Sequence, residues 1–423
     1  MSSDWPLTSI AQLAGDWKGS MAVGPFGSRM KADLYVSSGV RVIRGNNLNG
    51  CREPEGDYVF VSEETADSLA SCCVEPGDLV FPHRGNIGEV GITPDDGYRY
   101  MLSTSLMKLS PDRTKVDPLY LMYYFKSPIG RAALLMNASQ VGTPGIATPL
   151  KSLRGIQLSL PPLELQRRIA ATLSILDDRI TLLRDTNATL EALAEATFKS
   201  WFVDFDPVRA KGRGQIPEGM DEMTATLFPR SFDESGLGSI PAGWGVGTID
   251  DLLELAYGKA LKSTDRIEGS IPVYGSGGIT GFHNESLVAG PSIIVGRKGT
   301  VGSLYWEDRP FFPIDTVFYV RTTRPLTYCF YLLKTLGLEN MNTDGAVPGL
   351  NRNNVYRLNV VMPSKPILQA FDGLVTIFRT KISSNNERIK SLATLRDSLL
   401  PRLISGQIRI SEIEYTLNRG EAT

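Results

Sequence analysis

The chain has 423 residues, of which 42% are hydrophobic, and a formal net charge of −2. This length suffices for two or three hydrophobic cores, and no run of roughly 18 apolar residues suggests a membrane-spanning helix. The near-neutral charge argues against an ordinary basic nucleic-acid-binding protein, because Lys and Arg supply most of the affinity for phosphate.

Cysteine and histidine are scarce. The four cysteines form no Cys-x-x-Cys pair, and nothing near Met1 resembles a secretion signal, so we expect reduced thiols and a cytoplasmic protein. His83 and His283 are the only histidines, which argues against a His-rich metal site and predicts no bound metal.

The first predicted element is a globular domain of mixed α/β structure over residues 1–160. Short strands with alternating apolar residues, at 58–61 and 78–81, are separated by glycine-rich turns, and a helix is expected at 118–125. Its charges nearly cancel, with 15 basic and 16 acidic residues, so any nucleic-acid surface must be a local patch.

A long helix is predicted over residues 161–204. Apolar residues recur at alternating spacings of four and three, which is the pattern of a coiled-coil seam. The seam positions are Ile169, Leu173, Leu176, Ile180, Leu183, Asn187 and Leu190. The following residues 205–240 are rich in Gly, Pro and charge, and we expect a linker and loop segment without packed elements.

The second half repeats this order. Residues 241–362 predict another mixed α/β domain, with a strand at 292–295 and a helix at 325–336, and with 11 basic and 11 acidic residues. Residues 363–412 predict a second long helix, and 413–423 a C-terminal tail. The second seam consists of Phe371, Val375, Phe378, Ile382, Asn385, Ile389 and Leu392, with a break at Arg396 that Leu395 is expected to cover.

We expect the two helices to pair as an antiparallel coiled coil. Helices of about 38 residues, near 57 Å at 1.5 Å per residue, are too long for one small domain to cover, which disfavours the alternative that each lies on its own domain. One Asn in each seam, Asn187 and Asn385, is the kind of polar residue that fixes register.

An internal repeat links the two halves. Trp5 and Ile10 match Trp244 and Ile249 in spacing. Residues 39–45, 84–88 and 143–146 match 269–275, 298–302 and 347–350 in glycine placement and apolar alternation. This pattern predicts two copies of one fold.

The order of these motifs resembles a known family. Residues 160–169 (Leu-Pro-Pro-Leu-Glu-Leu-Gln-Arg-Arg-Ile), the helix end at 199–211, Ile-Pro-Ala-Gly-Trp at 240–244 and Leu-Leu-Pro-Arg-Leu-Ile-Ser-Gly at 399–406 closely resemble the specificity subunits of type I restriction–modification systems. The resemblance covers nearly the whole chain.

The resemblance implies two target-recognition domains, 1–160 and 241–362, each reading one half of a bipartite, asymmetric target in double-stranded DNA. The helices would act as spacer and as docking site for two adenine-N6 DNA methylase subunits, which ATP-dependent motor and endonuclease subunits join. S-adenosylmethionine and ATP with Mg would then be bound by those partners and not by this chain, and no membrane is involved.

The residues themselves predict no catalytic site. We find neither a methylase cofactor loop with an Asn-Pro-Pro-aromatic motif nor a Gly-x-x-x-x-Gly-Lys-Ser/Thr loop. Asp112 with Lys115 lacks the second acid of a nuclease triad and is interpreted as an exposed turn. Asp204, Asp206 and Arg209 are interpreted as solvated charges at a helix end.

What remains is a set of loop residues suited to reading base edges, because Arg and Asn offer paired donors and acceptors. Each alone could be an ordinary solvated loop residue, but as a set they fall at matched positions in both halves. The candidates are Arg44, Asn46, Asn47, His83, Arg84 and Asn86 in the first half, and Tyr274, Ser276, Arg297, Lys298, Thr300, Asn351, Arg352 and Asn353 in the second.

Two other hypotheses stay open at this point. One keeps the DNA-reading role but places the chain in a modification–cleavage enzyme outside type I. The other is a coiled-coil assembly scaffold without a DNA role.

Overall fold

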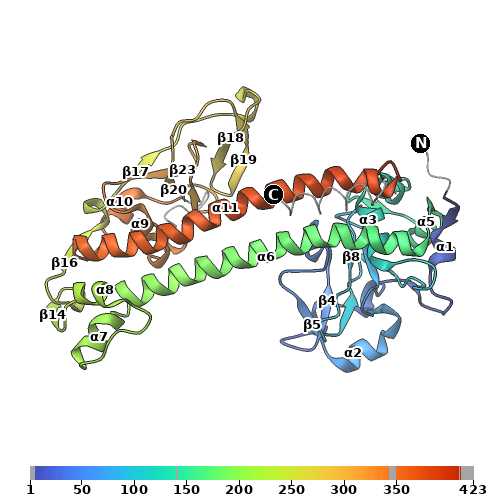
Figure 1. Cartoon of the computed structure of the whole chain (residues 1–423), viewed down its shortest axis with the longest axis horizontal. Helices are drawn as coiled ribbons and strands as arrows, with labels where there is room; N and C mark the ends of the chain where they lie inside the picture. Colours follow the sequence, from blue (N-terminus) through green and yellow to red (C-terminus); the bar gives the residue numbers. More distant parts are fainter. Residues whose placement is uncertain (1–4, 140–141, 343–348, 409, 411–423) are drawn as a thin grey trace. The chain divides into compact units, whose positions relative to one another are not determined.

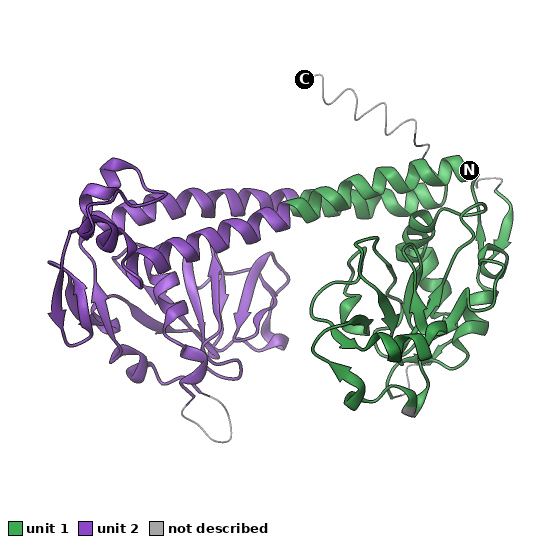
Figure 2. Ribbon diagram, turned by 90° about the horizontal axis from the view of Figure 1, so that it is seen from below, with its two compact units in different colours: residues 1–182, 389–423 green, residues 183–388 purple. Residues whose placement is uncertain are grey.

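A computed structural model describes residues 5–139, 142–342, 349–408 and 410 (Figure 1). The C-terminal tail expected at 413–423, the end of the predicted distal helix at 411–412, and part of the 347–350 motif lie outside these residues. The chain divides into two compact units, Met1–Leu182 with Ile389–Thr423, and Leu183–Arg388, called unit 1 and unit 2 (Figure 2). Within the described residues, no helix is long and apolar enough to cross a membrane.

Unit 1 is built on two sheets with short helices around them. The four-stranded sheet has the order β2 (Met21–Val23), β10 (Leu106–Leu109), β7 (Leu79–Pro82), β8 (Gly91–Ile92). The five-stranded sheet has the order β3 (Tyr35–Val36), β5 (Val59–Val61), β4 (Val40–Ile43), β9 (Tyr100–Leu102), β6 (Cys73–Val74). The remaining strands pair as β1 (Leu7–Ser9) with β13 (Gln157–Ser159) and β11 (Ala138–Ser139) with β12 (Gly145–Ile146). Its short α-helices are α1 (Ile10–Leu13), α2 (Glu63–Ser68), α3 (Pro118–Lys126), α4 (Pro128–Leu135) and α5 (Pro149–Gly155).

Unit 2 repeats this plan. Its four-stranded sheet has the order β17 (Glu254–Tyr257), β23 (Val317–Arg321), β20 (Ser292–Gly296), β21 (Leu304–Glu307), and a three-stranded sheet has the order β19 (Gly278–His283), β18 (Ile271–Gly275), β22 (Phe312–Pro313). Strand β16 (Gly245–Thr248) pairs with β24 (Asn359–Met362), and β14 (Phe232–Ser235) with β15 (Gly238–Pro241). Its short α-helices are α7 (Asp206–Gly212), α8 (Glu222–Leu227), α9 (Leu326–Thr335) and α10 (Arg352–Tyr356).

The strand pairings confirm the predicted internal repeat. The order β2-β10-β7-β8 in unit 1 corresponds to β17-β23-β20-β21 in unit 2, strand for strand in chain sequence. In the neighbouring sheets, β4 pairs antiparallel with β5 and parallel with β9, just as β18 pairs with β19 and β22. The two halves therefore share one mixed α/β fold, as predicted.

The two long helices are α6 (Leu163–Phe202) and α11 (Lys365–Ile404), each 40 residues long. In unit 1, Arg396 of α11 bonds to Asp177 of α6 at 2.7 Å. In unit 2, Arg379 contacts Glu191 at 3.1 Å, and the ring of Phe371 lies 5.8 Å from that of Phe198. Positions rise along one helix as they fall along the other, so the pairing is antiparallel, and every predicted seam residue is buried or half-buried.

The seam asparagines meet within unit 2. Asn385 is fully buried and donates from Nδ2 to Oδ1 of Asn187 at 2.8 Å, while Asn187 donates to Asn386 at 2.9 Å. Because these amides bond only at one alignment of the helices, their position fits the predicted role in fixing register.

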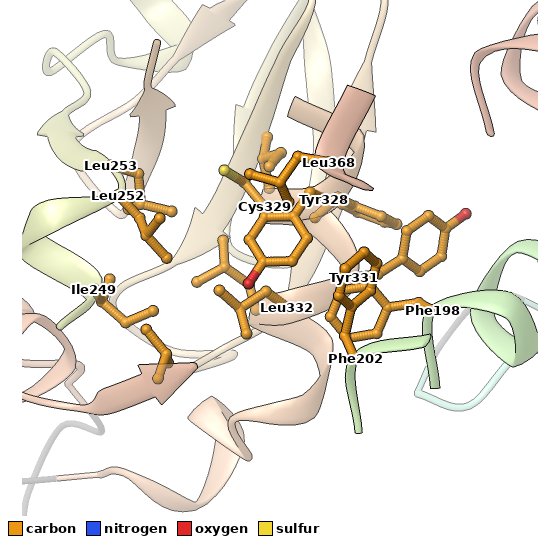
Figure 3. Close-up of a cluster of buried hydrophobic side chains, with 14 of the residues drawn as sticks. Phe198, Phe202, Ile249, Leu252, Leu253, Tyr328, Cys329, Tyr331, Leu332 and Leu368 are labelled. Atoms are coloured by element: carbon orange, nitrogen blue, oxygen red, sulfur yellow. The ribbon is translucent and has the colours of Figure 1, made fainter. Parts of the chain in front are cut away.

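Aromatic side chains anchor the helices to the body of unit 2 (Figure 3). Phe198 and Phe202 of α6 pack against Tyr328 of α9, with ring centroids 5.7 and 5.1 Å away. Phe371 of α11 joins them at 5.2 Å from Phe202. The coiled-coil seam thus continues directly into the hydrophobic core of the domain.

Two sequence-based expectations are wrong. Residues 205–240 are not an unpacked linker, because they form α7, α8 and a hairpin and bury Val208 and Phe228 in the core of unit 2. The few apolar side chains among the Gly, Pro and charged residues are enough to anchor the segment. Leu395 is 41% exposed and does not cover the break in the seam; Arg396 stays there itself, because Asp177 neutralises it.

Candidate nucleic-acid interface

In unit 2, a turn that contains two glycines with positive φ follows β20 and carries Arg297, Lys298 and Thr300. Gly299 and Gly302 adopt φ values of 84° and 72°, in the left-handed region that glycine favours. The backbone N–H groups of Arg297 and Lys298 donate to the carbonyl of Thr316. The turn is therefore fixed by its backbone, which leaves its side chains to face outward.

Unit 1 builds the same turn after β7. Gly85 and Gly88 adopt φ values of 84° and 89°. The N–H of His83 donates to the Ser105 carbonyl at 2.9 Å, as that of Arg297 donates to Thr316. Arg84 and Lys298 each form a β-bridge to a glycine, Gly145 and Gly349. The structure thus aligns His83 with Arg297 and Arg84 with Lys298.

The turn of unit 2 borders a hollow of about 360 Å³, here called the basic hollow. It brings together five of the predicted residues with Tyr257 at its wall. The lining residues are Tyr257, Arg297, Lys298, Gly349, Leu350, Asn351, Arg352 and Asn353. None of these described residues is acidic, so three cations gather here although the domain as a whole is neutral.

Tyr257 organises the cations of the basic hollow. Tyr257 is 48% exposed, and the guanidinium carbons of Arg297 and Arg352 lie 4.9 and 4.8 Å from the centroid of its ring. Arg297 also donates to the carbonyl of Asp315 at 2.9 Å. Cation–π contacts of this kind hold guanidinium groups in place without neutralising them.

Asn351 has a structural role at the edge of the hollow. Its side-chain oxygen accepts from the N–H of Asn353 at 2.9 Å and caps α10. The side chain of Asn353 itself is exposed.

Tyr274 and Ser276 serve the scaffold of unit 2. Tyr274 is buried and donates to Glu307 at 2.9 Å, and burial raises the pKa of its hydroxyl. Ser276 accepts through its carbonyl from Ser303 at 2.6 Å. Thr300, by contrast, is exposed on the turn.

In unit 1, two predicted residues hold a loop together. Asn47 is 1% exposed and donates to the carbonyls of Glu55 and Asp57, and Arg44 also donates to the Asp57 carbonyl. The Asn47 amide nitrogen and one N–H group of Arg44 are thus used inside the protein. Asn46 is exposed on the same loop.

The exposed turn of unit 1 carries Arg84 and Asn86, next to a half-buried His83. Burial lowers the pKa of the His83 imidazole, because desolvation disfavours its charged form. A neutral imidazole can both donate and accept a hydrogen bond.

Tyr257 is a functional candidate that the sequence did not predict. It lies opposite Phe318 in β23, at the place that Val23 occupies opposite Met107 in unit 1. Because the repeat substitutes an aromatic residue for valine at this one position, only the strand register identifies it.

The acidic groups considered from sequence are paired with neighbouring residues. Asp112 pairs with Lys115 at 2.9 Å and accepts from Thr114, which lowers the pKa of its carboxyl to about 2 and confirms the exposed turn. Asp204 pairs with Lys199, and its carbonyl accepts from Arg209 at 2.8 Å. In the described ranges, no three His, Cys, Asp or Glu side chains are grouped to hold a metal ion.

The chain contains two copies of one mixed α/β domain. Each copy continues into one of two paired helices and presents a polar turn at an equivalent place. Residues 26–192 and 241–393 match the type I restriction modification DNA specificity domain, and the chain belongs to this family. The double match corresponds to the two halves of the repeat, so the chain is a specificity subunit with two recognition domains.

Several relatives carry the same description. The chain is 27% identical over 410 residues to the type I restriction enzyme HindI specificity subunit of Haemophilus influenzae, covering 80% of this chain and 88% of the relative. It is 24% identical over 401 residues to the MjaIX specificity subunit of Methanocaldococcus jannaschii, covering 84% and 85%.

A solved structure has the same fold. The type I restriction–modification S subunit from M. genitalium aligns over 95% of this chain and 96% of its own, with a TM-score of 0.57 and 18% identity.

Proposed function

We propose that each domain reads one half of a bipartite, asymmetric DNA target, and that the helices space the domains and dock methylase subunits. The observation that carries this is the basic hollow of unit 2, which concentrates three cations on an otherwise neutral domain. Side chains on a rigid turn beside such a hollow are suited to base edges and phosphates.

The duplicated turn supports the proposal that the two domains read different half-sites. His83 and Arg84 occupy the places of Arg297 and Lys298, so the two domains present different side chains from one backbone shape. Different side chains in equivalent places favour two different half-sites, and hence an asymmetric target.

The partners we propose are those that the family resemblance implies, and the charge of this chain is consistent with them. With a net charge of −2, it has little basic surface for non-specific attraction to phosphate. We infer that the two adenine-N6 methylase subunits implied by the family supply that surface and bind S-adenosylmethionine. ATP-dependent motor and endonuclease subunits, which would bind ATP and Mg, complete the assembly.

The test is DNA binding by the purified chain, alone and with its methylase partner. The target is first found by mapping methylated adenines in host DNA with and without this gene. We expect the complex to bind that target tightly and with strong salt dependence, and the chain alone to bind weakly and to neither methylate nor cleave. Methyl transfer or cleavage by the chain alone would overturn the proposal, and an unchanged methylation map would favour a scaffold without a DNA role.

A further inference from the structure

We propose that unit 2 reads a guanine in the major groove through Arg352, with Tyr257 as the residue that positions its guanidinium. This rests on the proposed function and adds to it the base and the residue. Tyr257 acts through Arg352 and touches no base in this account.

The two rings beneath Arg352 are held in place. The guanidinium carbon lies 4.8 Å from the centroid of Tyr257 and 5.9 Å from that of Tyr356. Tyr257 packs edge-on against Phe318 at 5.0 Å, and the hydroxyl of Tyr356 accepts from the N–H of Leu255 at 2.8 Å. Both rings are therefore tied to the four-stranded sheet.

Stacking on rings engages the face of a guanidinium and leaves its N–H groups, which lie in its plane, for a ligand. The structure gives the Arg352 guanidinium ring contacts and no hydrogen bond to any described residue. A planar fork of two donors matches O6 and N7 of guanine, the two acceptors that this base presents in the major groove. The arrangement therefore favours guanine over the other bases.

The neighbouring cations are suited to other tasks. Arg297 donates to the Asp315 carbonyl, which commits part of its fork to the protein, and its guanidinium carbon lies 4.9 and 5.8 Å from the ring centroids of Tyr257 and Phe318. Lys298 is exposed, and its ammonium is a compact charge that suits phosphate. Arg352 is thus the cation of the basic hollow that contacts two anchored rings and whose N–H groups form no hydrogen bond to a described residue.

The described residues of unit 1 do not repeat this arrangement at the equivalent place. The place of Tyr257 is taken by Val23, which offers no ring for a guanidinium. The guanine contact is therefore expected in one half-site only.

The test uses the complex with its methylase partner and the target found by methylation mapping. Each guanine of the target is replaced in turn by 7-deazaguanine, which pairs normally but lacks the N7 acceptor. We expect one position, in the half-site of unit 2, at which the replacement weakens binding. Because O6 still accepts one of the two hydrogen bonds, the loss should be several-fold and stay below the roughly 150-fold upper range for a bidentate contact. The Arg352→Ala complex should be insensitive to replacement at that position.

Three further variants separate base reading from simple charge. Arg352→Lys keeps the charge without the fork and should lose the same discrimination, whereas Tyr257→Phe keeps the ring and should retain it. Tyr257→Ala should weaken discrimination at that position alone. Arg357→Ala removes an exposed cation at the end of α10 that does not line the hollow and should leave it unchanged.

The outcomes distinguish this inference from the proposed function. If Arg352→Ala weakens binding equally for all sequences and lowers the salt dependence by about one ion, Arg352 contacts phosphate and the inference fails. It also fails if the Arg352→Ala complex keeps full sensitivity to every 7-deazaguanine. If the unaltered complex discriminates no sequence at all, the proposed function fails with it.

Discussion

The Arg396–Asp177 pair in unit 1 allows a quantitative prediction about the helix seam. Arg396 occupies a seam position where the heptad pattern calls for an apolar residue, and it donates to Asp177 at 2.7 Å. Asp177 also accepts from Tyr123 at 2.6 Å, and the two charged side chains are 26% and 11% exposed. Removing one partner of a fully buried pair costs about 3–5 kcal/mol. Partial exposure and the apolar gain reduce the expected cost of Arg396→Leu to roughly 2 kcal/mol.

The assay is urea unfolding of the purified chain, with hydrogen exchange of the amides between Ile389 and Ile404 as the local readout. Asp177→Asn removes the charge but keeps an acceptor for Tyr123, so the double variant with Arg396→Leu should recover most of the lost stability. Arg388→Leu, at an exposed position of the same helix, should change stability by less than about 0.5 kcal/mol. A double variant as unstable as Arg396→Leu alone would refute the reasoning, because the penalty would not then come from an unpaired buried charge.

Three other predictions concern the turn, a titration and the seam. Gly302→Ala should lower the free energy of unfolding by several kcal/mol, because the new Cβ would lie 2.3 Å from a backbone nitrogen and the residue would have to keep a φ of 72°. Gly88→Ala should lower it by only about 1–2 kcal/mol, because its Cβ meets side chains at 3.3 Å. Equal losses of thermal stability in the two variants would argue against this. Because burial lowers the pKa of His83 in the folded state, the unfolded chain binds the proton more readily, and stability should fall as the pH drops below about 6.5 toward the folded pKa. His83→Gln should flatten that part of the stability profile, and an unchanged slope would exclude His83 as its source. Replacing both Asn187 and Asn385 by Leu should raise the unfolding midpoint while loosening helix register, which cross-linking of paired cysteines can measure; a single register in the variant would contradict the role given to these amides.

Much of the fold follows from the sequence because periodicity and duplication are strong signals. The residues predicted to form the seam from Ile169 to Leu190 are buried or half-buried in the structure, and glycine placement alone was enough to align the two turns. The expectations that were wrong concerned segments in which tertiary contacts override local composition. Phe228 anchors a segment rich in Gly and Pro, and Asp177 lets Arg396 remain in a seam.

The site was harder to predict than the fold. Residue type identified Arg297 and Arg352 as candidates. It could not show that Asn47 differs from them, because the Asn47 amide donates to the carbonyls of its own loop and is not available to a ligand. Tyr257 was not predicted from the sequence, because its role depends on the strand register that brings β17 beside the turn after β20. Which hydrogen bonds a side chain forms and how the strands are ordered are properties of the folded chain, and residue type alone predicts neither.

The most direct test of the central claim is a methylation map of host DNA carrying a chimera, in which residues 241–362 are replaced by the corresponding domain of a specificity subunit with a different target. If each domain reads its own half-site, the map will show one half of the target changed and the other half intact. A chimera that leaves both halves unchanged, or that alters both, would contradict the account.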